Sequence, residues 1–298
     1  MKNLKKKLPN ILLTLIFIIG AGIFAYPTIS NQWNKYHQSV AIASYEQQVE
    51  STSEEDFTQA WNDAEAYNAS ITENTFSSDA FADEEKNLRE TPYWNVLNLS
   101  DTGIMGYISI PEINQKLPIY HGTSDSVLQI GAGHLSGTKL PIGGSGNHSV
   151  IAAHRGLPSA KLFSDLDKLQ IGDKFYIHIL NETLAYEVDQ ILPMVDKDDT
   201  EALSSALQNV EGEDYVTLFT CTPYGINSHR LLVRGTRVEY HGEDEAKVSD
   251  ETMLESIQEY YMLYALLVIA VILLIFAIVK VKKWKKRKAK EAKNEKIQ

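Results

Sequence analysis

Cysteine is almost absent from this chain of 298 residues, since Cys221 is the only one. No disulfide can therefore form within the chain, and a small fold stapled by several bridges is excluded. A lone cysteine is either a small hydrophobe in the core or a reactive thiol. Exported proteins usually pair their cysteines, so the choice depends on where the chain resides and on what surrounds Cys221.

Acidic residues are scarce at both ends of the chain. Residues 1–8 contain four lysines and no acid, and residues 280–298 contain ten Lys or Arg and two Glu. The ends together carry a charge of +12 and the whole chain carries −11, which leaves −23 for the segment between them. A segment this acidic excludes nucleic acid as the expected partner, and most of the charge is a solvated surface.

Two apolar runs adjoin these basic ends, from Ile11 to Ala25 and from Tyr261 to Val279. Basic flanks stay in the cytoplasm, so the segment between the runs is expected outside the cell, attached to the cell membrane. Ile23, two residues before Ala25, is not small, so Ala25 would be a poor end for a cleaved signal peptide. This favours an uncleaved anchor, although an anchor and a signal peptide both stay open. The expected segments are a cytoplasmic N-terminus at 1–8, a signal anchor or signal peptide at 9–27, a transmembrane helix at 261–280 and a basic cytoplasmic tail at 281–298.

Proline is absent from residues 31–90, which are polar and rich in Ala, Glu, Asp and Asn. We expect a helical region over 28–95, with amphipathic helices at Tyr45–Trp61 and Asp63–Tyr67. Residues 96–241 change to short β-type runs separated by Gly, Pro and Asn, which predicts one closed or sandwich-like β domain, followed by a linker at 242–260. The expected strands are Gly106–Ile110, Lys116–Tyr120, Ser149–Ala153, Phe175–Leu180, Thr183–Ile191, Tyr215–Cys221 and Arg230–Val238, with a turn at Asn181–Glu182.

A reactive Cys221 needs help from its surroundings, because a thiol with a pKa of about 8.5 is only slightly ionised at neutral pH. Among eight histidines, His154 ranks first, since it ends an apolar strand-like run and opens a Gly-Pro loop. Arg230 lies nine positions after Cys221, and His229 beside it faces the other side of a strand. The remaining histidines offer weaker contexts: His37, His121, His134, His148, His178 and His241.

Residues Thr217–Gly235 contain Thr-Leu-Phe-Thr-Cys followed by Arg230 on the next expected strand. This pattern resembles the signature of sortases, the cysteine transpeptidases of Gram-positive cell surfaces. Further stretches in the same order resemble class C, the sortases that polymerise pilins, and the likeness extends over about Leu97–Tyr240. These stretches are Gly106–Pro111, Leu117–Thr123 and His154–Phe163.

The resemblance implies a closed eight-stranded β-barrel with short helices and no cofactor. It makes Cys221 the nucleophile, His154 the proton-transfer residue and Arg230 the group that holds the oxyanion or clamps the substrate backbone. It also gives Thr220 a substrate contact, although a threonine in a strand is more often there for packing. No spacing of metal ligands is evident in the sequence.

Class C sortases have an Asp-Pro-aromatic lid, and the nearest match here is Asp79-Ala80-Phe81. Alanine stands where proline would impose a rigid turn, so the lid is expected to open more readily. The resemblance implies that Asp79 pairs with Arg230 and that Phe81 covers Cys221. Phe57 and Phe76 are alternative aromatic residues.

The resemblance further implies cleavage of a Leu-Pro-x-Thr-Gly-like sorting signal between Thr and Gly, through a thioester on Cys221. The acyl group then passes to a pilin lysine amine, so the partners are pilin subunits or surface proteins with C-terminal sorting signals. A housekeeping sortase that anchors proteins to peptidoglycan is the alternative enzyme. A surface adhesin or pilin is disfavoured, since Glu251–Gln258 before the apolar tail contain no sorting signal.

Overall fold

The computed structural model describes residues 2–75, 79–81, 87–242 and 244–246, together with 265, 271, 279–284 and 287. For residues 2–15 and 18 it describes only the helical backbone. The chain divides into two compact units, Met1–Ala246 and Lys247–Gln298. Most of the expected linker at 242–260, the transmembrane helix at 261–280 and the basic tail at 281–298 lie outside the described residues.

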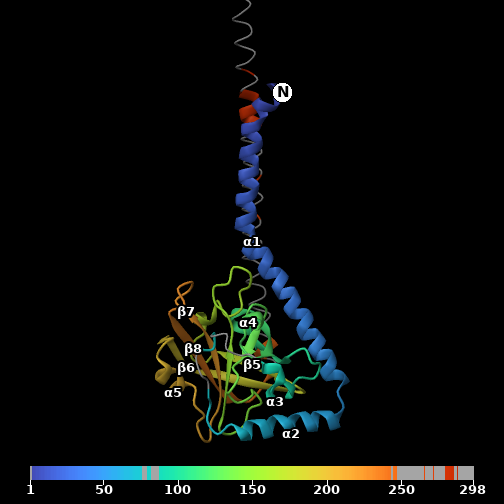
Figure 1. The fold of residues 1–298 in the computed structure, drawn as a ribbon, viewed down its shortest axis with the longest axis vertical. Helices are drawn as coiled ribbons and strands as arrows, with labels where there is room; N and C mark the ends of the chain where they lie inside the picture. The colour runs from blue at the N-terminus through green and yellow to red at the C-terminus, as the bar shows by residue number, and fades with distance from the viewer. Residues whose placement is uncertain are drawn as a thin grey trace, which may run out of the picture. The chain divides into compact units, whose positions relative to one another are not determined.

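Two long helices precede the barrel, α1 (Lys2–Ser51) and α2 (Glu54–Ser70) (Figure 1). The prediction of a single helix over Tyr45–Trp61 is wrong, because α1 ends at Ser51 and α2 begins at Glu54. Ser53 caps α2 by accepting a hydrogen bond from the Asp56 amide at 3.1 Å, and three acidic residues fill the first turn, where they interact favourably with the helix dipole. No helix in the described part of the chain has the length and apolar character needed to cross a bilayer.

Eight strands close into a barrel in the order β1-β2-β3-β4-β7-β8-β6-β5, which confirms the expected architecture. The pairs β2–β3 and β4–β7 are parallel and the other pairs are antiparallel. The strands are β1 (Ile104–Ile110), β2 (Gln115–His121), β3 (Ala132–His134), β4 (Asn147–Ala152), β5 (Lys174–Ile179), β6 (Glu182–Asp196), β7 (Asp214–Thr222) and β8 (His229–Val238). The short helices η1 (Leu88–Glu90) and α3 (Pro92–Asn95) precede β1, and other short helices connect strands: η2 (Pro111–Ile113), α4 (Asp125–Leu128), η3 (Leu166–Lys168) and α5 (Thr200–Ala206).

Each of the seven expected strands overlaps an observed strand, and β3 is the one that the sequence did not reveal. Its three residues include Gly133 and are too few to show an alternating pattern. The turn between β5 and β6 lies at Leu180–Asn181, one residue before its expected place. The register of β6 shifts between Leu192 and Val195, around Pro193, which cannot donate to the ladder.

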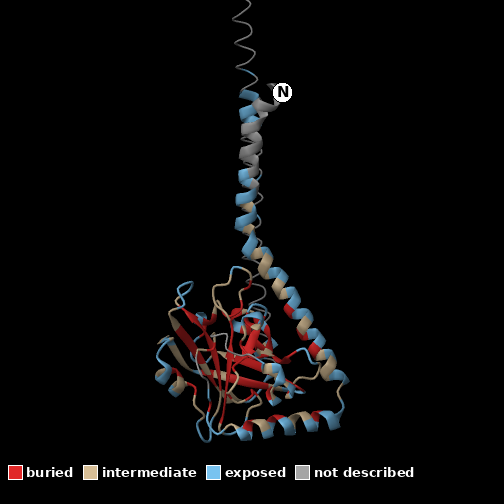
Figure 2. Cartoon of the chain, in the orientation of Figure 1, coloured by how far each residue is buried: buried red, intermediate tan, exposed pale blue. Residues whose placement is uncertain are grey.

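Buried side chains concentrate inside the barrel, and α2 also buries one face, whereas the outer faces of α1 and α2 are exposed to solvent (Figure 2). The second half of α1 is attached to the barrel through Tyr45, which is buried. The Tyr45 hydroxyl donates to the Met105 carbonyl at 3.1 Å and accepts from the Leu180 amide at 2.8 Å. The helical region is therefore part of the same unit as the barrel.

The middle of α1 also contacts the loop that follows β4. Ser30 Oγ and Asn34 Nδ2 donate to the Ser159 carbonyl at 2.8 and 2.7 Å, and the Lys161 amide donates to Asn31 Oδ1 at 2.8 Å. This loop contains His154 near its start, so α1 holds the later part of the segment that carries the leading histidine candidate.

Candidate active site

Cys221 on β7 lies directly opposite Arg230 on β8 in the antiparallel ladder. Directly opposed residues project to the same side of a sheet, so the thiol and the guanidinium share one face. Cys221 is 5% exposed and Arg230 is 4% exposed. The ladder therefore brings a buried cation beside the only thiol of the chain.

His154 reaches the same place from β4, which runs parallel to β7. Ala152 is level with Phe219 in that ladder, so continuing both chains by two residues brings His154 level with Cys221. The Ala153 amide donates to the Phe219 carbonyl at 3.2 Å, which extends the pairing beyond the end of β4. The structure thus brings together all three predicted catalytic residues at one end of β4, β7 and β8.

Thr220 lies between these elements, on the opposite face of β7 from Cys221. Its side chain is completely buried, and its hydroxyl donates to the Ala153 carbonyl at 2.7 Å. The predicted substrate contact has no support in this arrangement. Thr220 instead ties the cysteine strand to the residue before His154, because a buried hydroxyl needs a partner.

Asp79 and Phe81 cover this end of the barrel. Arg230 Nε donates to Asp79 Oδ1 at 2.7 Å, and Arg230 Nη2 donates to Asp79 Oδ2, so the pairing expected for Asp79 is present. The Phe81 ring stacks on His154 at a centroid distance of 5.3 Å and lies 5.2 Å from the Arg230 guanidinium carbon. Phe81 therefore contacts two of the three predicted catalytic residues directly.

Two further residues lie close to His154, and no sequence pattern marks either of them as a site residue. Asp125 on α4 places Oδ1 3.8 Å from His154 Nε2. Arg155 donates from Nη1 to Thr222 Oγ1 at 3.1 Å and from Nη2 to Asp167 Oδ2 at 2.5 Å. Arg155 follows His154, and Thr222 follows Cys221, so this arginine links the two segments that carry these predicted catalytic residues.

Comparison with known proteins identifies this arrangement. The sequence model of the Sortase domain family matches residues 108–238. The crystal structure of sortase C1 from Streptococcus agalactiae is 48% identical, with a TM-score of 0.60, and the match covers 67% of this chain and 99% of that one. The chain belongs to the sortase family.

A second solved structure agrees with class C membership of this sortase. Sortase C of Streptococcus pneumoniae is 44% identical, with a TM-score of 0.59, over 67% of this chain and 97% of that one. Sortase A of Bacillus anthracis is 29% identical over 143 residues, which are 47% of this chain and 63% of that protein. The match therefore spans less than two thirds of this curated relative, whereas it spans nearly all of the sortase C structures.

Burial dominates the electrostatics of the covered sortase site. Removal from water raises the pKa of the Cys221 thiol to about 11, Arg230 and Arg155 lower it, and Asp79 raises it. Burial also lowers the pKa of His154, and Asp125 opposes that effect. Both shifts favour a neutral thiol beside a neutral imidazole at pH 7 while Asp79 and Phe81 stay in place.

Three other histidines are structural members of the barrel. His134 donates from Nε2 to the Lys139 carbonyl at 2.9 Å, and His148 donates from Nδ1 to the Gln208 carbonyl at 2.8 Å. Burial lowers the pKa of His134 to about 3 and that of His148 to about 4. His121 is likewise buried and contacts the Gly103 and Val96 carbonyls. These partners account for their positions without a catalytic role.

Proposed function

We propose that this sortase cleaves a Leu-Pro-x-Thr-Gly-like sorting signal between Thr and Gly and joins the Thr carbonyl to a lysine amine of a pilin subunit. The observation that carries this proposal is the cross-strand pair of Cys221 and Arg230, level with His154 and covered by Asp79 and Phe81. The likeness to sortase C structures supports the pilin amine as the acceptor.

In the first half-reaction, the substrate displaces the Asp79–Phe81 segment and frees Arg230. Loss of Asp79 and entry of water both lower the pKa of Cys221, because they favour the thiolate, and the thiol proton passes to His154, which becomes the imidazolium. The thiolate attacks the Thr carbonyl, and Arg230 donates to the oxyanion that develops. The imidazolium form of His154 protonates the leaving glycine amine as the carbon–nitrogen bond breaks, which leaves a thioester on Cys221.

In the second half-reaction, a lysine amine attacks the thioester carbonyl. His154, now neutral, takes a proton from the attacking nitrogen. The new amide bond forms as the bond to sulfur breaks, and Cys221 leaves as a thiolate. The reaction therefore ends with the thiolate and the imidazolium with which it began.

Asp79 and Phe81 act as a lid in this scheme. The lid occupies Arg230 through a bidentate ion pair and His154 through ring stacking. Both groups are therefore unavailable until the segment moves, and the neutral thiol is protected from oxidants and other thiols in the meantime.

The same proposal places the enzyme at the cell membrane, with the catalytic unit outside the cell. Its support is the pair of apolar runs at 11–25 and 261–279 and the basic residues beside them. A membrane-impermeant thiol reagent applied to intact cells should label Cys221 once the lid is removed by substitution. Labelling that requires lysis of the cells would place the catalytic unit inside.

The decisive test incubates the full-length enzyme with a candidate pilin and a sorting-signal peptide. Covalent pilin ladders should appear with the native enzyme and vanish in Cys221→Ala. Transfer only to cell-wall stem peptides would instead identify a housekeeping sortase. Ladders that persist in Cys221→Ala would reject the proposed mechanism.

A further inference from the structure

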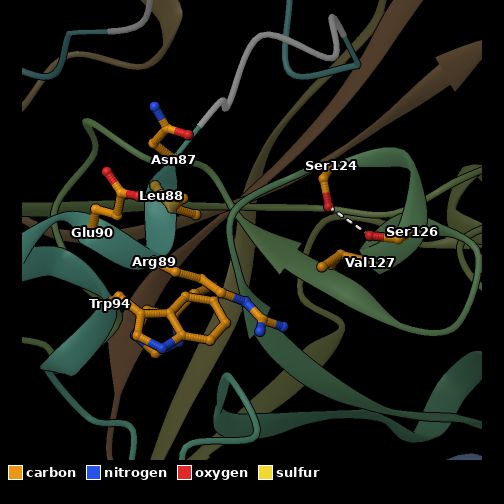
Figure 3. Close-up of a pocket in the computed structure, with 9 residues that line it drawn as sticks. Asn87, Leu88, Arg89, Glu90, Trp94, Ser124, Ser126 and Val127 are labelled. Carbon is orange, nitrogen blue, oxygen red and sulfur yellow. Dashed lines mark hydrogen bonds between the residues drawn. The ribbon is translucent and has the colours of Figure 1, made fainter.

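A pocket with no role in the proposed reaction lies beside the turn whose Asp125 contacts His154. It has a volume of about 400 Å³. Its walls come from residues 87–90, which follow the lid along the chain, and from the turn around α4 (Figure 3). The polar and aromatic side chains that line it include Arg89, Glu90, Trp94, Ser124 and Ser126.

The guanidinium of Arg89 is the cationic group of this pocket. Its central carbon lies 5.0 Å from the Trp94 ring centroid, within the range of a cation–π contact. No carboxylate in the described part of the chain forms an ion pair with Arg89, and Glu90 is directed away from the guanidinium (Figure 3). Arg89 therefore has donors that an incoming anion can use.

Trp94 gives this arginine a fixed support. Its indole nitrogen donates to Asp101 Oδ1 at 3.1 Å. A β-carbon built on Gly103, which has a φ of +79°, would approach the Trp94 ring to 2.6 Å. The indole thus packs directly on the backbone of Gly103, which holds the ring in place and offers Arg89 a rigid surface.

The opposite wall supplies hydroxyl groups. Ser124 Oγ and Ser126 Oγ lie 3.0 Å apart and hydrogen-bond to each other (Figure 3). Each hydroxyl can also bind a further polar group, because a hydroxyl has one donor and two acceptor positions. A guanidinium on one wall and a pair of hydroxyls on the other suit a carboxylate between them.

The turn connects this pocket to the site of amine attack. Asp125 lies between the two serines, and its carboxylate is the group 3.8 Å from His154 Nε2. His154 is the residue that receives the proton of the attacking amine in the proposed reaction. A chain that delivers a lysine to His154 from this side must therefore pass over the turn and the pocket behind it.

We propose that this pocket binds an acidic side chain of the acceptor protein, close in space to the lysine that attacks the thioester. The carboxylate pairs with Arg89 and accepts hydrogen bonds from the serine hydroxyls. The pocket thereby selects which lysine reaches His154, whereas the sorting signal is recognised separately at the Cys221 end. This inference depends on the transpeptidase function proposed above.

The test uses the purified full-length enzyme, a sorting-signal donor peptide and lysine-containing acceptor peptides. Each acceptor pair differs only in whether glutamate or glutamine stands at a given separation from the lysine. At the preferred separation we expect the KM for the glutamate peptide to be roughly tenfold lower, as one charge-assisted contact would give. Arg89→Gln should abolish that preference, and Arg89→Glu should transfer it to a peptide with arginine in place of glutamate.

Lys168→Gln is the matched control, because Lys168 on η3 is another exposed cation of the same unit. It changes the net charge equally and should retain the preference for glutamate. A native enzyme that shows no preference at any separation, or a preference that survives in Arg89→Gln, would overturn the inference. Failure of the native enzyme to cleave the donor peptide in a Cys221-dependent way would overturn the proposed function instead.

Discussion

Two arginines four residues apart on the same face of β8 each pair with an aspartate, but the two aspartates belong to different kinds of segment. Arg234 Nε and Nη2 donate to Asp189 at 3.1 and 2.6 Å, between neighbouring strands of the barrel. Arg230 is bound in the same bidentate way by Asp79, which lies 151 positions earlier in the sequence and belongs to no helix or strand. The chemistry of the two pairs is the same, but the supports of the two carboxylates differ.

That difference separates a structural pair from a removable one. The backbone of Asp189 is held by β6, so this aspartate stays beside Arg234 as long as the barrel is intact. Asp79 is attached to the barrel mainly by its own ion pair and by the contacts of Ala80 and Phe81. An arginine that must become free during a reaction needs the second kind of partner.

The largest expected effect distinguishes the two arginines. Arg230→Lys should lower kcat/KM for sorting-signal cleavage by roughly 100-fold or more, because lysine lacks the planar fork that holds an oxyanion. Arg234→Lys, the matched control, should change kcat/KM by no more than about threefold, because Arg234 pairs with Asp189 inside the sheet and takes no part in the proposed reaction. Equal losses in the two variants would show that both arginines act through the fold.

The next effect concerns the two carboxylates. Replacing Asp79 and Phe81 with alanine should raise the rate at which a thiol reagent labels Cys221 by roughly tenfold to 100-fold at pH 7. Each unit by which the pKa falls raises the thiolate fraction about tenfold. Asp189→Ala should leave the labelling rate within about twofold of the native enzyme. An unchanged rate in the double variant would reject the lid.

The pH dependence of labelling sharpens the same comparison. In the native enzyme the labelling rate should keep rising toward pH 11, because burial raises the pKa of Cys221 to about 11. Removal of Asp79 takes away a negative charge that also raises this pKa, and exposure to water favours the thiolate further. The double lid variant should therefore reach half of its maximal rate at a lower pH. The measurement is the labelling rate across pH 6 to pH 11, and coincident profiles would contradict the assigned cause.

The smallest effect should appear in stability. Asp189→Asn should lower the free energy of unfolding by about 1 kcal/mol or less, because the Arg234 side chain is still 21% exposed and water can replace the lost partner. Denaturant titration measures this change. A decrease of several kcal/mol in the free energy of unfolding would show that the Asp189–Arg234 pair stabilises the barrel more than a surface ion pair does.

The sequence predicted the reactive end of this barrel better than its periphery. Cys221 and Arg230 lie on adjacent antiparallel strands, so their pairing follows from local spacing once the turn between them is placed. His154 also follows a regular strand. The alignment of β4 with β7 could not be derived locally, because parallel neighbours are joined by long connections, and it rested on the resemblance.

The residues that escaped prediction depend on contacts between distant segments. Arg155 and Asp125 act through partners on other loops, and neither has a pattern around it that marks it as unusual. The pairing of Asp79 with Arg230 was likewise inferred by resemblance alone, because the tripeptide lacks the proline that would have made it conspicuous. The burial of Thr220 beneath β4 needed three-dimensional packing to become visible.

The contacts between α1 and the loop after His154 bear on how the protein can be shortened. A chain that begins after Asn34 loses the side chains that hold the Ser159 carbonyl and the Lys161 amide. Such a truncated protein should keep its barrel but position His154 less firmly than one that begins before Ser30. A shortened protein should therefore begin before Ser30, so that the loop after β4 keeps its contacts with α1. The helix α1 sets this limit although it contributes no residue to the candidate active site.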